Sequence, residues 1–564
     1  MASTTIAPAA VTTTEINVVA VTDVHGSLYS YDFITGKETS GGLARVMSFL
    51  REQRAKYGDN CIFVDNGDIL QGQPCAYYYN YIDTTSVHLV SDMLNFMGCR
   101  IGNFGNHDVE TGHAVYDRWV EQCNYPVLGA NVLDRATGMP YLRPYKIEER
   151  NGVKIAFLGM ITPAIPSWLA EKLWQGLAFE DIEESCRKWV PYLQKVEQPD
   201  LIVGVFHSGQ SGNMLNGVCE NSSRQVAERV PGFDLIIFGH DHVKECCVVE
   251  NAAGKDVFLV NAANNAKSVA DVVIKVTKDG DQVVKKAIDG RVVDLSKYEQ
   301  DAEFCAKFAP QRTAVEAFVN EKIGTIDSTI RGREAYFGPC AFIDLIHQLQ
   351  LNISGAQVSL VAPLAFDPVL EMGDITVGDM FNLYKFENML YTMRLTGREI
   401  KGLLELSYAR WTNTMTSPDD HILALKTVKR EGQKDRVTFE NASFNFDSAA
   451  GILYTVDVTK PAGEKVKIDC MADGSPFVPE KEYLVAVNSY RGNGGGDLLT
   501  LGSGIAKEEL SKRIVNATVK DLRYYLINYI REQKSLKPRA LNQWKFVPEK
   551  WTEKAIERDK ALLF

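Results

Sequence analysis

From residue 16 to about residue 275, short apolar runs alternate with amphipathic helical stretches, and this alternation limits the possible folds more than any other feature. The apolar runs cover residues 16–21, 61–64, 100–104, 154–158, 201–206, 235–238 and 257–260. Helical patterns lie between them at residues 42–57, 86–97, 114–122 and 183–196. Apolar runs that alternate with helices indicate α/β layering around a buried sheet.

The chain has 564 residues, too many for one hydrophobic core, because cores stop growing at roughly 250–300 residues. Downstream of the α/β region, the patterns predict helices at residues 396–408 and 519–533 and strands at 437–441, 453–458, 465–469 and 483–488. We therefore expect a disordered lead-in (1–14), an α/β domain (15–294), a linker helix (295–324), an α+β domain (325–547) and a charged tail (548–564).

Charge and composition exclude several classes of protein. With 61 Lys and Arg against 72 Asp and Glu, the formal net charge is −11, so bulk charge does not favour binding to nucleic-acid polymers or anionic membranes. No apolar run approaches the length of about 18 residues that a membrane span requires. The N-terminus has neither an early basic residue nor an apolar segment, so we expect no secretory signal in the sequence as written. Eleven scattered cysteines argue against a disulfide framework.

Polar motifs follow directly after the predicted strands. They are Asp23-x-His25, Gly67-Asp68, Gly105-Asn106-His107-Asp108 and Gly239-His240-x-His242, and His207 ends a fifth strand. Ligands collect at the carboxyl ends of strands in open α/β sheets, so these motifs are expected to converge. A lone histidine is usually a hydrogen-bonded structural residue, but five of the nine histidines occupy these strand ends. We therefore interpret the set as functional.

Imidazole, carboxylate and amide groups without thiolates suit a divalent ion such as Zn, Mn, Co or Fe. A carboxylate between two such clusters can bridge two ions about 3.5–4 Å apart, as in-line displacement at phosphorus requires.

The motifs D-x-H, GD, GNH and GH-x-H, in this order over residues 16–275, resemble those of the calcineurin-like metallophosphoesterase family. Flanking segments at 41–45 (GGLAR) and 127–132 (VLGANV) are similar to its 5′-nucleotidase and 2′,3′-cyclic-nucleotide phosphodiesterase branch. The resemblance implies a four-layer αββα domain with two divalent metal ions. One ion would be held by Asp23, His25, Asp68 and His242, and the other by Asp68, Asn106, His207 and His240, with Asp68 bridging.

The resemblance also implies that His107 acts on the leaving group as a general acid. The residue three positions later is Glu110, where the family commonly has Asp, and Asp108 stands where Glu is usual. Glu110 is therefore the expected catalytic partner of His107, through a longer side chain. A second departure is Asn261–Asn265 (NAANN), where the family usually has a more glycine-rich turn.

The C-terminal half resembles the 5′-nucleotidase C-terminal domain, which in this family binds the nucleoside. By that resemblance the expected substrate-binding residues are Arg331, Arg333, Phe386, Asn388, Tyr490 and Asp497. Phe386 and Tyr490 would stack on either face of a base, although aromatic residues after strands are more often core. Ala-Pro-Leu at 362–364 and Tyr-Arg-x-x-Gly-Gly-Gly at 490–496 favour the 2′,3′-cyclic phosphodiesterase/3′-nucleotidase branch.

The sequence thus predicts a dimetal hydrolase of nucleotide phosphate esters, in which a hydroxide between the ions attacks phosphorus. Two alternatives remain open. One is a hydrolase of another phosphate or sulfur ester on the same fold, such as a thiosulfohydrolase, and the other is a catalytically degenerate nucleotide-binding protein. The expected partner is a small nucleotide, not a nucleic-acid polymer or a membrane, and the oligomeric state stays open. Relatives are typically periplasmic or extracellular, whereas no export signal is visible here, so the location also stays open.

Overall fold

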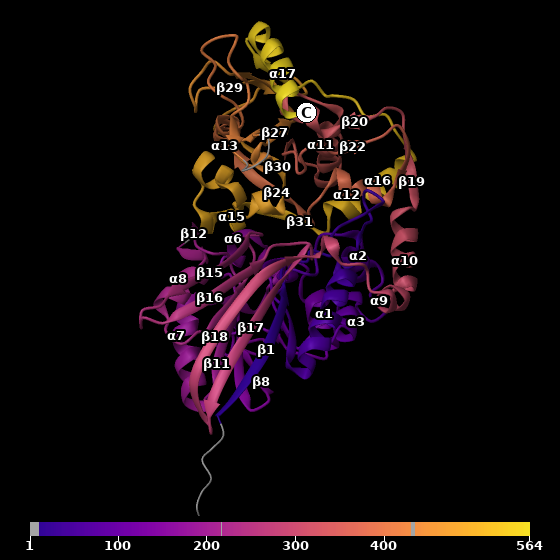
Figure 1. The fold of residues 1–564 in the computed structure, drawn as a ribbon. Coiled ribbons are helices and arrows are strands. Elements are labelled where there is room, and N and C mark those ends of the chain that lie inside the picture. The colour runs from indigo at the N-terminus through magenta and orange to yellow at the C-terminus, as the bar shows by residue number, and fades with distance from the viewer. Residues whose placement is uncertain (1–10, 216, 430–434) are drawn as a thin grey trace, which may run out of the picture. The chain divides into compact units, whose positions relative to one another are not determined.

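The structure, a computed structural model, describes residues 11–215, 217–429 and 435–564. The chain divides between Ala317 and Phe318 into two compact units (Figure 1). This division falls inside the segment that was expected to link the domains.

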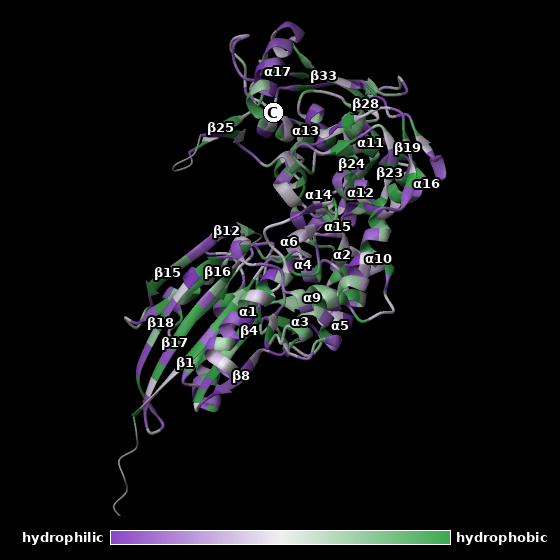
Figure 2. Ribbon diagram, turned by 45° about the vertical axis from the view of Figure 1, so that its right-hand side comes forward, coloured by the Kyte–Doolittle hydropathy of each residue, from purple (hydrophilic) through white to green (hydrophobic). Residues whose placement is uncertain are grey.

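The first unit contains two six-stranded sheets. The first sheet has the order β18-β17-β1-β4-β5-β6, in which β1, β4, β5 and β6 are parallel and β17 and β18 are antiparallel additions. Its strands are β1 (Val11–Val21), β4 (Cys61–Asp65), β5 (Ile101–Asn103), β6 (Val127–Leu128), β17 (Ser268–Asp279) and β18 (Gln282–Asp294). In Figure 2, β1 and β17 show green, hydrophobic residues interspersed with purple ones, and in β1 only the second half is buried.

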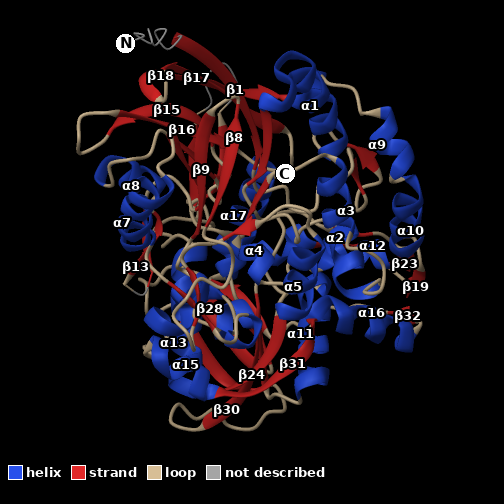
Figure 3. Cartoon of the chain, turned by 90° about the horizontal axis from the view of Figure 1, so that it is seen from below, coloured by secondary structure: helices blue, strands red, loops and turns tan. Residues whose placement is uncertain are grey.

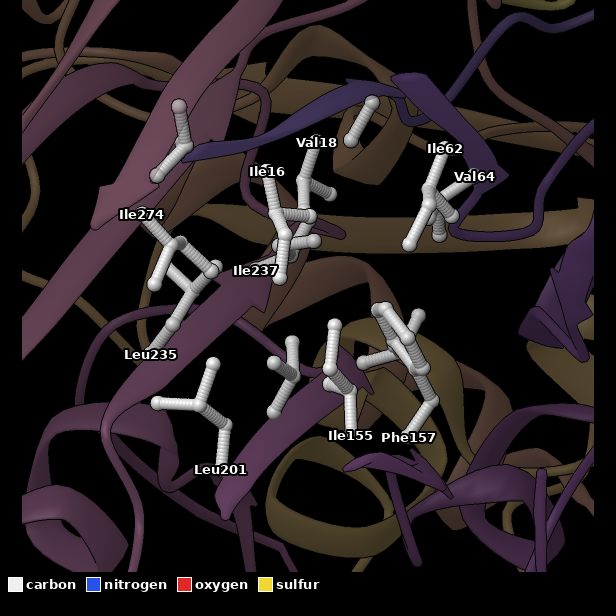
Figure 4. Close-up of a cluster of buried hydrophobic side chains, with 14 of the residues drawn as sticks. Ile16, Val18, Ile62, Val64, Ile155, Phe157, Leu201, Leu235, Ile237 and Ile274 are labelled. Atoms are coloured by element: carbon white, nitrogen blue, oxygen red, sulfur yellow. The ribbon is translucent and has the colours of Figure 1, made fainter. Parts of the chain in front are cut away.

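The second sheet has the order β15-β16-β14-β11-β9-β8, with four parallel strands in the centre and an antiparallel strand at each edge. Its strands are β8 (Tyr145–Arg150), β9 (Val153–Ile161), β11 (Leu201–His207), β14 (Leu235–Phe238), β15 (Lys244–Glu250) and β16 (Asp256–Ala262). The two sheets pack face to face. Figure 4 shows Ile16, Val18 and Ile62 from one sheet meeting Ile155, Phe157 and Leu235 from the other, and all of them are at most 1% exposed.

Helices cover the outer faces of both sheets (Figure 3). On one side, α1 (Leu43–Tyr57) packs on β1 and β4, with α3 (Leu89–Phe96) and α5 (His113–Gln122) nearby. On the other side, α7 (Ile182–Tyr192) and α8 (Ser223–Arg229) bury Ile182 and Val226 against the second sheet. The layers therefore run helix, sheet, sheet, helix, and the predicted four-layer fold class is confirmed.

Shorter elements connect these layers. The helices are α2 (Pro74–Tyr77), α4 (Asn106–Val109), α6 (Ile165–Trp168), α9 (Ala302–Lys307) and α10 (Ala309–Val319). The strand pairs are β2 (Tyr31–Asp32) with β3 (Lys37–Glu38), β7 (Val132–Asp134) with β10 (Leu177–Phe179), and β12 (Gly212–Leu215) with β13 (Val218–Asn221).

The second unit is built on a five-stranded mixed sheet with the order β27-β21-β30-β24-β31. Its strands are β21 (Val358–Val361), β24 (Met389–Thr396), β27 (Ser448–Ala450), β30 (Glu482–Asn488) and β31 (Ile514–Asp521). Helices α11 (Ala341–Ser354) and α13 (Gly397–Trp411) pack on this sheet. This mixture of helices and antiparallel pairs agrees with the expected α+β class.

Smaller sheets surround it. They comprise β19 (Lys322–Ile326), β23 (Gly373–Thr376) and β32 (Ser535–Leu536); β20 (Ile330–Arg331) and β22 (Val369–Leu370); β25 (Leu425–Val428) and β26 (Arg436–Phe439); and β28 (Ile452–Asp457), β29 (Val466–Met471) and β33 (Trp544–Val547). The remaining helices are α12 (Val377–Leu383), α14 (Ser489–Gly492), α15 (Lys507–Arg513), α16 (Leu522–Gln533) and α17 (Glu549–Leu563).

Four expectations about these segments were wrong. Residues 11–14, assigned to the disordered lead-in, begin β1 and pair with β17, while residues 1–10 lie outside the described residues. The linker helix at 295–324 is interrupted, because α9 ends at Lys307, α10 at Val319, and β19 begins at Lys322. The helix expected at 519–533 starts only at Leu522, since residues 514–521 form edge strand β31.

The charged tail expected at residues 548–564 is the packed helix α17, in which Asp559 is fully buried. The Asp559 carboxylate accepts the backbone N–H of Leu423 at 2.9 Å and also contacts the ring of His421. Among the described residues, we find no helix with the length and apolar character needed to cross a membrane.

Candidate metal centre and substrate-binding loops

The carboxyl ends of the parallel strands bring together all seven residues that the sequence suggested as metal ligands. Asp23 follows β1, Asp68 follows β4, Asn106 opens the helix after β5, His207 ends β11, and His240 follows β14. His25 and His242 lie two residues beyond Asp23 and His240. Residues up to about 220 positions apart therefore meet, because the parallel strands of both sheets end on the same side of the domain.

One potential metal-binding group consists of Asp23, His25 and His242. The Nε2 atoms of His25 and His242 are 2.9 Å apart, and His242 Nε2 is 3.3 Å from Asp23 Oδ1. Asp23 is fully buried, whereas the His242 side chain is 41% exposed. This group therefore opens toward solvent on the His242 side.

The second group consists of Asp68, His207 and His240. His207 Nε2 lies 3.0 Å from Asp68 Oδ2 and 3.2 Å from Asn106 Oδ1, so the amide oxygen of Asn106 joins the same group. His207 Nδ1 donates its hydrogen to the backbone carbonyl of Asn66 at 2.8 Å. Because that bond occupies Nδ1, the lone pair of Nε2 is turned toward the other ligands.

The two groups are directly connected. The backbone N–H of His240 donates to the Asp23 carboxylate at 2.9 Å, and His207 Nε2 is 3.9 Å from Asp23 Oδ1. One carboxylate thus reaches residues of both groups. The backbone N–H of His107 donates to Asp68 Oδ1 at 2.8 Å, which orients the Asp68 carboxylate.

Five of the seven side chains stand on left-handed backbone. The φ angles are 51° for Asp23, 48° for His25, 57° for Asp68, 78° for His240 and 57° for His242. Such angles are uncommon outside glycine, and they cluster where the surrounding structure forces a sharp turn. The backbone strain is therefore located at residues that the sequence predicted to be metal ligands.

Neighbouring glycines allow these turns to approach one another. A Cβ atom on Gly105 would lie 2.2 Å from Asp68 Oδ1, and one on Gly239 would lie 2.7 Å from Asp23 Oδ2. Any larger residue at either position would push a carboxylate out of the group.

The charges at this edge suit divalent cations. Burial lowers the pKa of His25 to about 4, so its ring is neutral near pH 7 and has a free lone pair. Burial also opposes a charge on His207, but the Asp68 and Asp23 carboxylates outweigh it and raise the pKa of His207 to about 10. The carboxylates thus draw a positive charge to His207, and bound metal would supply that charge and displace the proton. Neutral imidazole, carboxylate and amide donors therefore fit two divalent ions.

His107 and Glu110 form the expected pair. His107 Nδ1 lies 2.6 Å from Glu110 Oε2, so the longer carboxylate reaches the ring. Burial disfavours a charge on His107, but Asp68 and Glu110 raise its pKa to about 9. With Nδ1 held by Glu110, Nε2 is the ring atom that can donate a proton.

Asp108, which stands where the family usually has Glu, supports the backbone. Its buried carboxylate accepts the N–H groups of Gly105, Asp68, Ile69 and Leu70, each at 2.9 Å. These bonds tie the turn that carries Asp68 to the turn that carries His107.

Sequence reasoning missed two residues at this edge. Glu220 Oε1 lies 2.7 Å from His240 Nε2, and the side-chain amide of Asn264 lies 3.1 Å from His242 Nδ1. Asn264 belongs to the NAANN turn, whose departure from the family pattern was the available signal. The backbone N–H of Asn265 also donates to the carbonyl of Asp23 at 2.8 Å. Glu220 stands outside any motif that the sequence presents.

The proposed aromatic clamp lies at one end of two neighbouring strands in the second unit. Leu390 of β24 pairs with Asn488 of β30, so Phe386, just before β24, and Tyr490, just after β30, leave the sheet at the same end. Both rings are partly exposed. The backbone N–H of Met389 donates to Ser489 Oγ at 3.1 Å, which ties the two loops together.

The other predicted substrate residues differ in availability. Asn388 is 6% exposed, whereas Arg331 and Asp497 are exposed. Arg333 is paired with Asp367 and lies over the Phe564 ring, so its guanidinium is already engaged. Arg491, which follows Tyr490, is buried and bonds Asp447 through Nε at 2.8 Å and Nη2 at 3.0 Å. Its Nη1 also donates to the backbone carbonyl of Gly495, so Arg491 supports the glycine-rich turn.

Residues 16–244 match the family model of calcineurin-like phosphoesterases, and residues 322–502 match that of the 5′-nucleotidase C-terminal domain. The chain is a calcineurin-like phosphoesterase with a 5′-nucleotidase C-terminal domain. Both matches fall where the sequence motifs led us to expect them, and the family resemblance inferred from those motifs is confirmed.

This phosphoesterase has similar relatives among characterised proteins. It is 28% identical to the 2′,3′-cyclic-nucleotide 2′-phosphodiesterase/3′-nucleotidase of Haemophilus influenzae, over 95% of this chain and 88% of the relative. It is 26% identical to the trifunctional nucleotide phosphoesterase protein YfkN of Bacillus subtilis, over 96% of this chain but only 39% of that longer relative. A solved structure of a candidate 5′-nucleotidase from Staphylococcus aureus shares the fold, with a TM-score of 0.76, 22% identity and coverage of 94% and 100% of the two chains.

Proposed function

We propose that this phosphoesterase hydrolyses nucleotide phosphate esters at a dimetal centre formed by Asp23, His25, Asp68, Asn106, His207, His240 and His242. The observation that carries the proposal is that two potential metal-binding groups and the His107–Glu110 pair lie together at the carboxyl ends of the parallel strands. We further propose that the native ions are drawn from Mn, Zn, Co and Fe, because the donors are nitrogen and oxygen without sulfur. Two such ions, when bound, supply positive charge for the phosphate and activate water near neutral pH.

The protein's own residues then have distinct tasks. The Asp68 carboxylate contacts His207 Nε2 and accepts the backbone N–H of His107, so it links the Asp68–His207–His240 group to the proposed acid. Glu110 holds His107 by Nδ1, which leaves Nε2–H available for the departing oxygen. General acid catalysis of this kind typically contributes about 10²–10⁴-fold in rate.

The substrate is proposed to be a mononucleotide. Phe386 and Tyr490 leave the sheet at one end, and stacking on an aromatic ring contributes about 1–3 kcal/mol per base. Arg331 is exposed and stays a candidate for the phosphate, whereas the pairing of Arg333 with Asp367 disfavours that role for Arg333. The similarity to a cyclic phosphodiesterase/3′-nucleotidase supports 2′,3′-cyclic and 3′ nucleotides as the first substrates to test.

Phosphate release across 5′-, 3′- and 2′,3′-cyclic nucleotides, each with Mn, Zn, Co and Mg, tests the proposal. We expect turnover with at least one nucleotide class and one metal, and its loss in Asp68→Asn. Hydrolysis of thiosulfate esters without nucleotide turnover would instead support the sulfur-ester alternative. Tight nucleotide binding with full metal loading and no hydrolysis would support a catalytically degenerate protein.

A further inference from the structure

A short hairpin places a buried carboxylate behind one of the proposed metal ligands. β12 and β13 form the hairpin, and Glu220 near its end points Oε1 at His240 Nε2, 2.7 Å away. The Glu220 side chain is only 11% exposed. Its second oxygen accepts the side-chain amide of Asn213 from the opposite strand. Both oxygens of Glu220 therefore have partners.

The hairpin is anchored next to another proposed ligand, His207. Ser208 Oγ donates to the Glu220 carbonyl at 2.8 Å and accepts the Ser222 backbone N–H at 3.1 Å. The backbone N–H of Gly209 donates to Asn221 Oδ1 at 3.0 Å. The position of Glu220 is thus tied to the end of β11, and the Trp168 ring flanks His240 with its centroid 5.7 Å away. These contacts leave the His240 ring little freedom to turn.

The contact between Glu220 and His240 selects one tautomer. A neutral imidazole has one N–H donor and one lone pair, and an ionised carboxylate only accepts hydrogen bonds. His240 must therefore carry its hydrogen on Nε2 to satisfy Glu220, which leaves the lone pair on Nδ1. Metal-binding histidines are commonly oriented in this way by a carboxylate or carbonyl on the other ring nitrogen.

The two potential metal-binding groups differ in the partners of their histidine rings and in the exposure of those rings. In the Asp68 group, His240 contacts a carboxylate and His207 contacts the Asn66 carbonyl. In the Asp23 group, His242 contacts the neutral amide of Asn264 and is 41% exposed, against 12% for His240. The Asp68 group thus has more nearby negative charge and less contact with water, and both favour a bound cation.

We propose that Glu220 is a positioning residue that orients His240 and makes the Asp68–His207–His240 site the tighter of the two metal sites. The proposal rests on the dimetal centre of the proposed function. Its test needs no substrate, so the two can fail separately: normal metal binding without hydrolysis of any ester would reject the proposed function alone.

Titration of the metal-free full-length protein with Co²⁺, followed by visible absorption and metal stoichiometry, tests the proposal. We expect two binding steps in the wild type. Glu220→Ala should weaken the tighter step by roughly 10–100-fold, the usual effect of removing such a partner, and leave the weaker step unchanged. Glu220→Gln keeps an oxygen that can accept the Nε2 hydrogen but loses the charge, so it should fall between wild type and Glu220→Ala.

Glu245→Gln is the matched control, because Glu245 also accepts a side-chain amide, that of Gln210, at 2.5 Å. It should titrate like the wild type. An unchanged tighter step in both Glu220 variants, or equal weakening of both steps, would overturn the proposal. A change in the Co²⁺ coordination number in Glu220→Gln at saturating metal, seen as a large change in band intensity, would also overturn it, since Glu220 would then be a direct ligand. Glu220→Gln has the same shape as the wild type, so it gives an answer even if Glu220→Ala fails to fold.

Discussion

Asp108→Asn removes the charge that holds the Asp68 turn against the His107 turn. In the wild type, Oδ1 accepts the N–H groups of Ile69 and Leu70, and Oδ2 accepts those of Asp68 and Gly105. Asparagine keeps one oxygen for two of these donors but turns an NH₂ group toward the other two. Hydrogen bonds to charged groups contribute about 1.5–3 kcal/mol each, so losing two should cost about 3–6 kcal/mol.

Urea and thermal unfolding of the metal-free protein measure this loss. A loss of 3 kcal/mol lowers the melting temperature by about 5 °C in a domain of roughly 300 residues, because the entropy of unfolding is about 2.1 cal/mol/K per residue. Asp134→Asn is the control, because Asp134 also accepts two backbone N–H groups, those of Ala136 and Thr137, but in an exposed turn. Asp134→Asn should lower the free energy of unfolding by no more than about 1 kcal/mol. Equal losses in the two variants would refute the assignment of Asp108 as the support of these turns.

Four further predictions concern the active site and the second unit. His107→Asn should lower kcat by roughly 10²–10⁴-fold with unchanged metal content, and wild-type turnover on every ester would contradict its role as the acid. Phe386→Ala and Tyr490→Ala should each lower kcat/KM for nucleotides by a factor that corresponds to about 1–3 kcal/mol, and should leave hydrolysis of p-nitrophenyl phosphate unchanged. The control Tyr524→Ala, at an exposed tyrosine, should leave both activities unchanged. Equal losses on both substrates would rule out stacking. Saturation with Mn²⁺ at about 100 times the Kd of a site should raise the free energy of unfolding by about 2.7 kcal/mol for each site that is filled, and no shift in melting temperature would argue against a metal centre. Asp559→Asn should lower the free energy of unfolding by about 1–3 kcal/mol if α17 packs as part of the second unit. An unchanged free energy of unfolding would instead support the solvated tail that the sequence suggested.

The strands of the first unit were predictable because both of their faces are buried. Central parallel strands read as continuous apolar runs, and β14 has the predicted bounds of 235–238. Other strands extend beyond the prediction, as β9 does at residues 153–161 against 154–158. In β9 the predicted run stops before Gly159, although the next two residues, Met160 and Ile161, are apolar and buried.

The wrong boundaries in the rest of the chain had readable signals. Asp301 caps α9 by accepting the backbone N–H of Phe304 at 2.8 Å, and Pro310 stands in the first turn of α10. Both are typical of helix starts, so they mark a break in the predicted linker helix. Asp521 likewise caps α16. In α17, Thr552, Ala555 and Asp559 are buried at helical spacing, but the many surrounding charges hid this stripe.

The proposed ligand positions could be read from sequence because each belongs to a short motif at a strand end. Glu220 could not, because its contact with His240 depends on where the β12–β13 hairpin folds back. Nothing in the neighbouring sequence distinguishes Glu220 from the glutamates on the surface. Residues that act through a ligand are therefore the part of such a site that three-dimensional structure must supply.

The strained backbone at the site explains why the motifs are so short. Five non-glycine residues on left-handed backbone cost about 1–3 kcal/mol each, so together they store roughly 5–15 kcal/mol. The chain tolerates this strain because each turn follows a strand buried between the facing sheet and a layer of helices, and because hydrogen bonds such as those of Asp108 hold the turns. Because the turns are sharp, these side chains converge within four residues of each strand end. A longer, relaxed loop could carry the same residues, but it would need to be ordered before it could hold an ion.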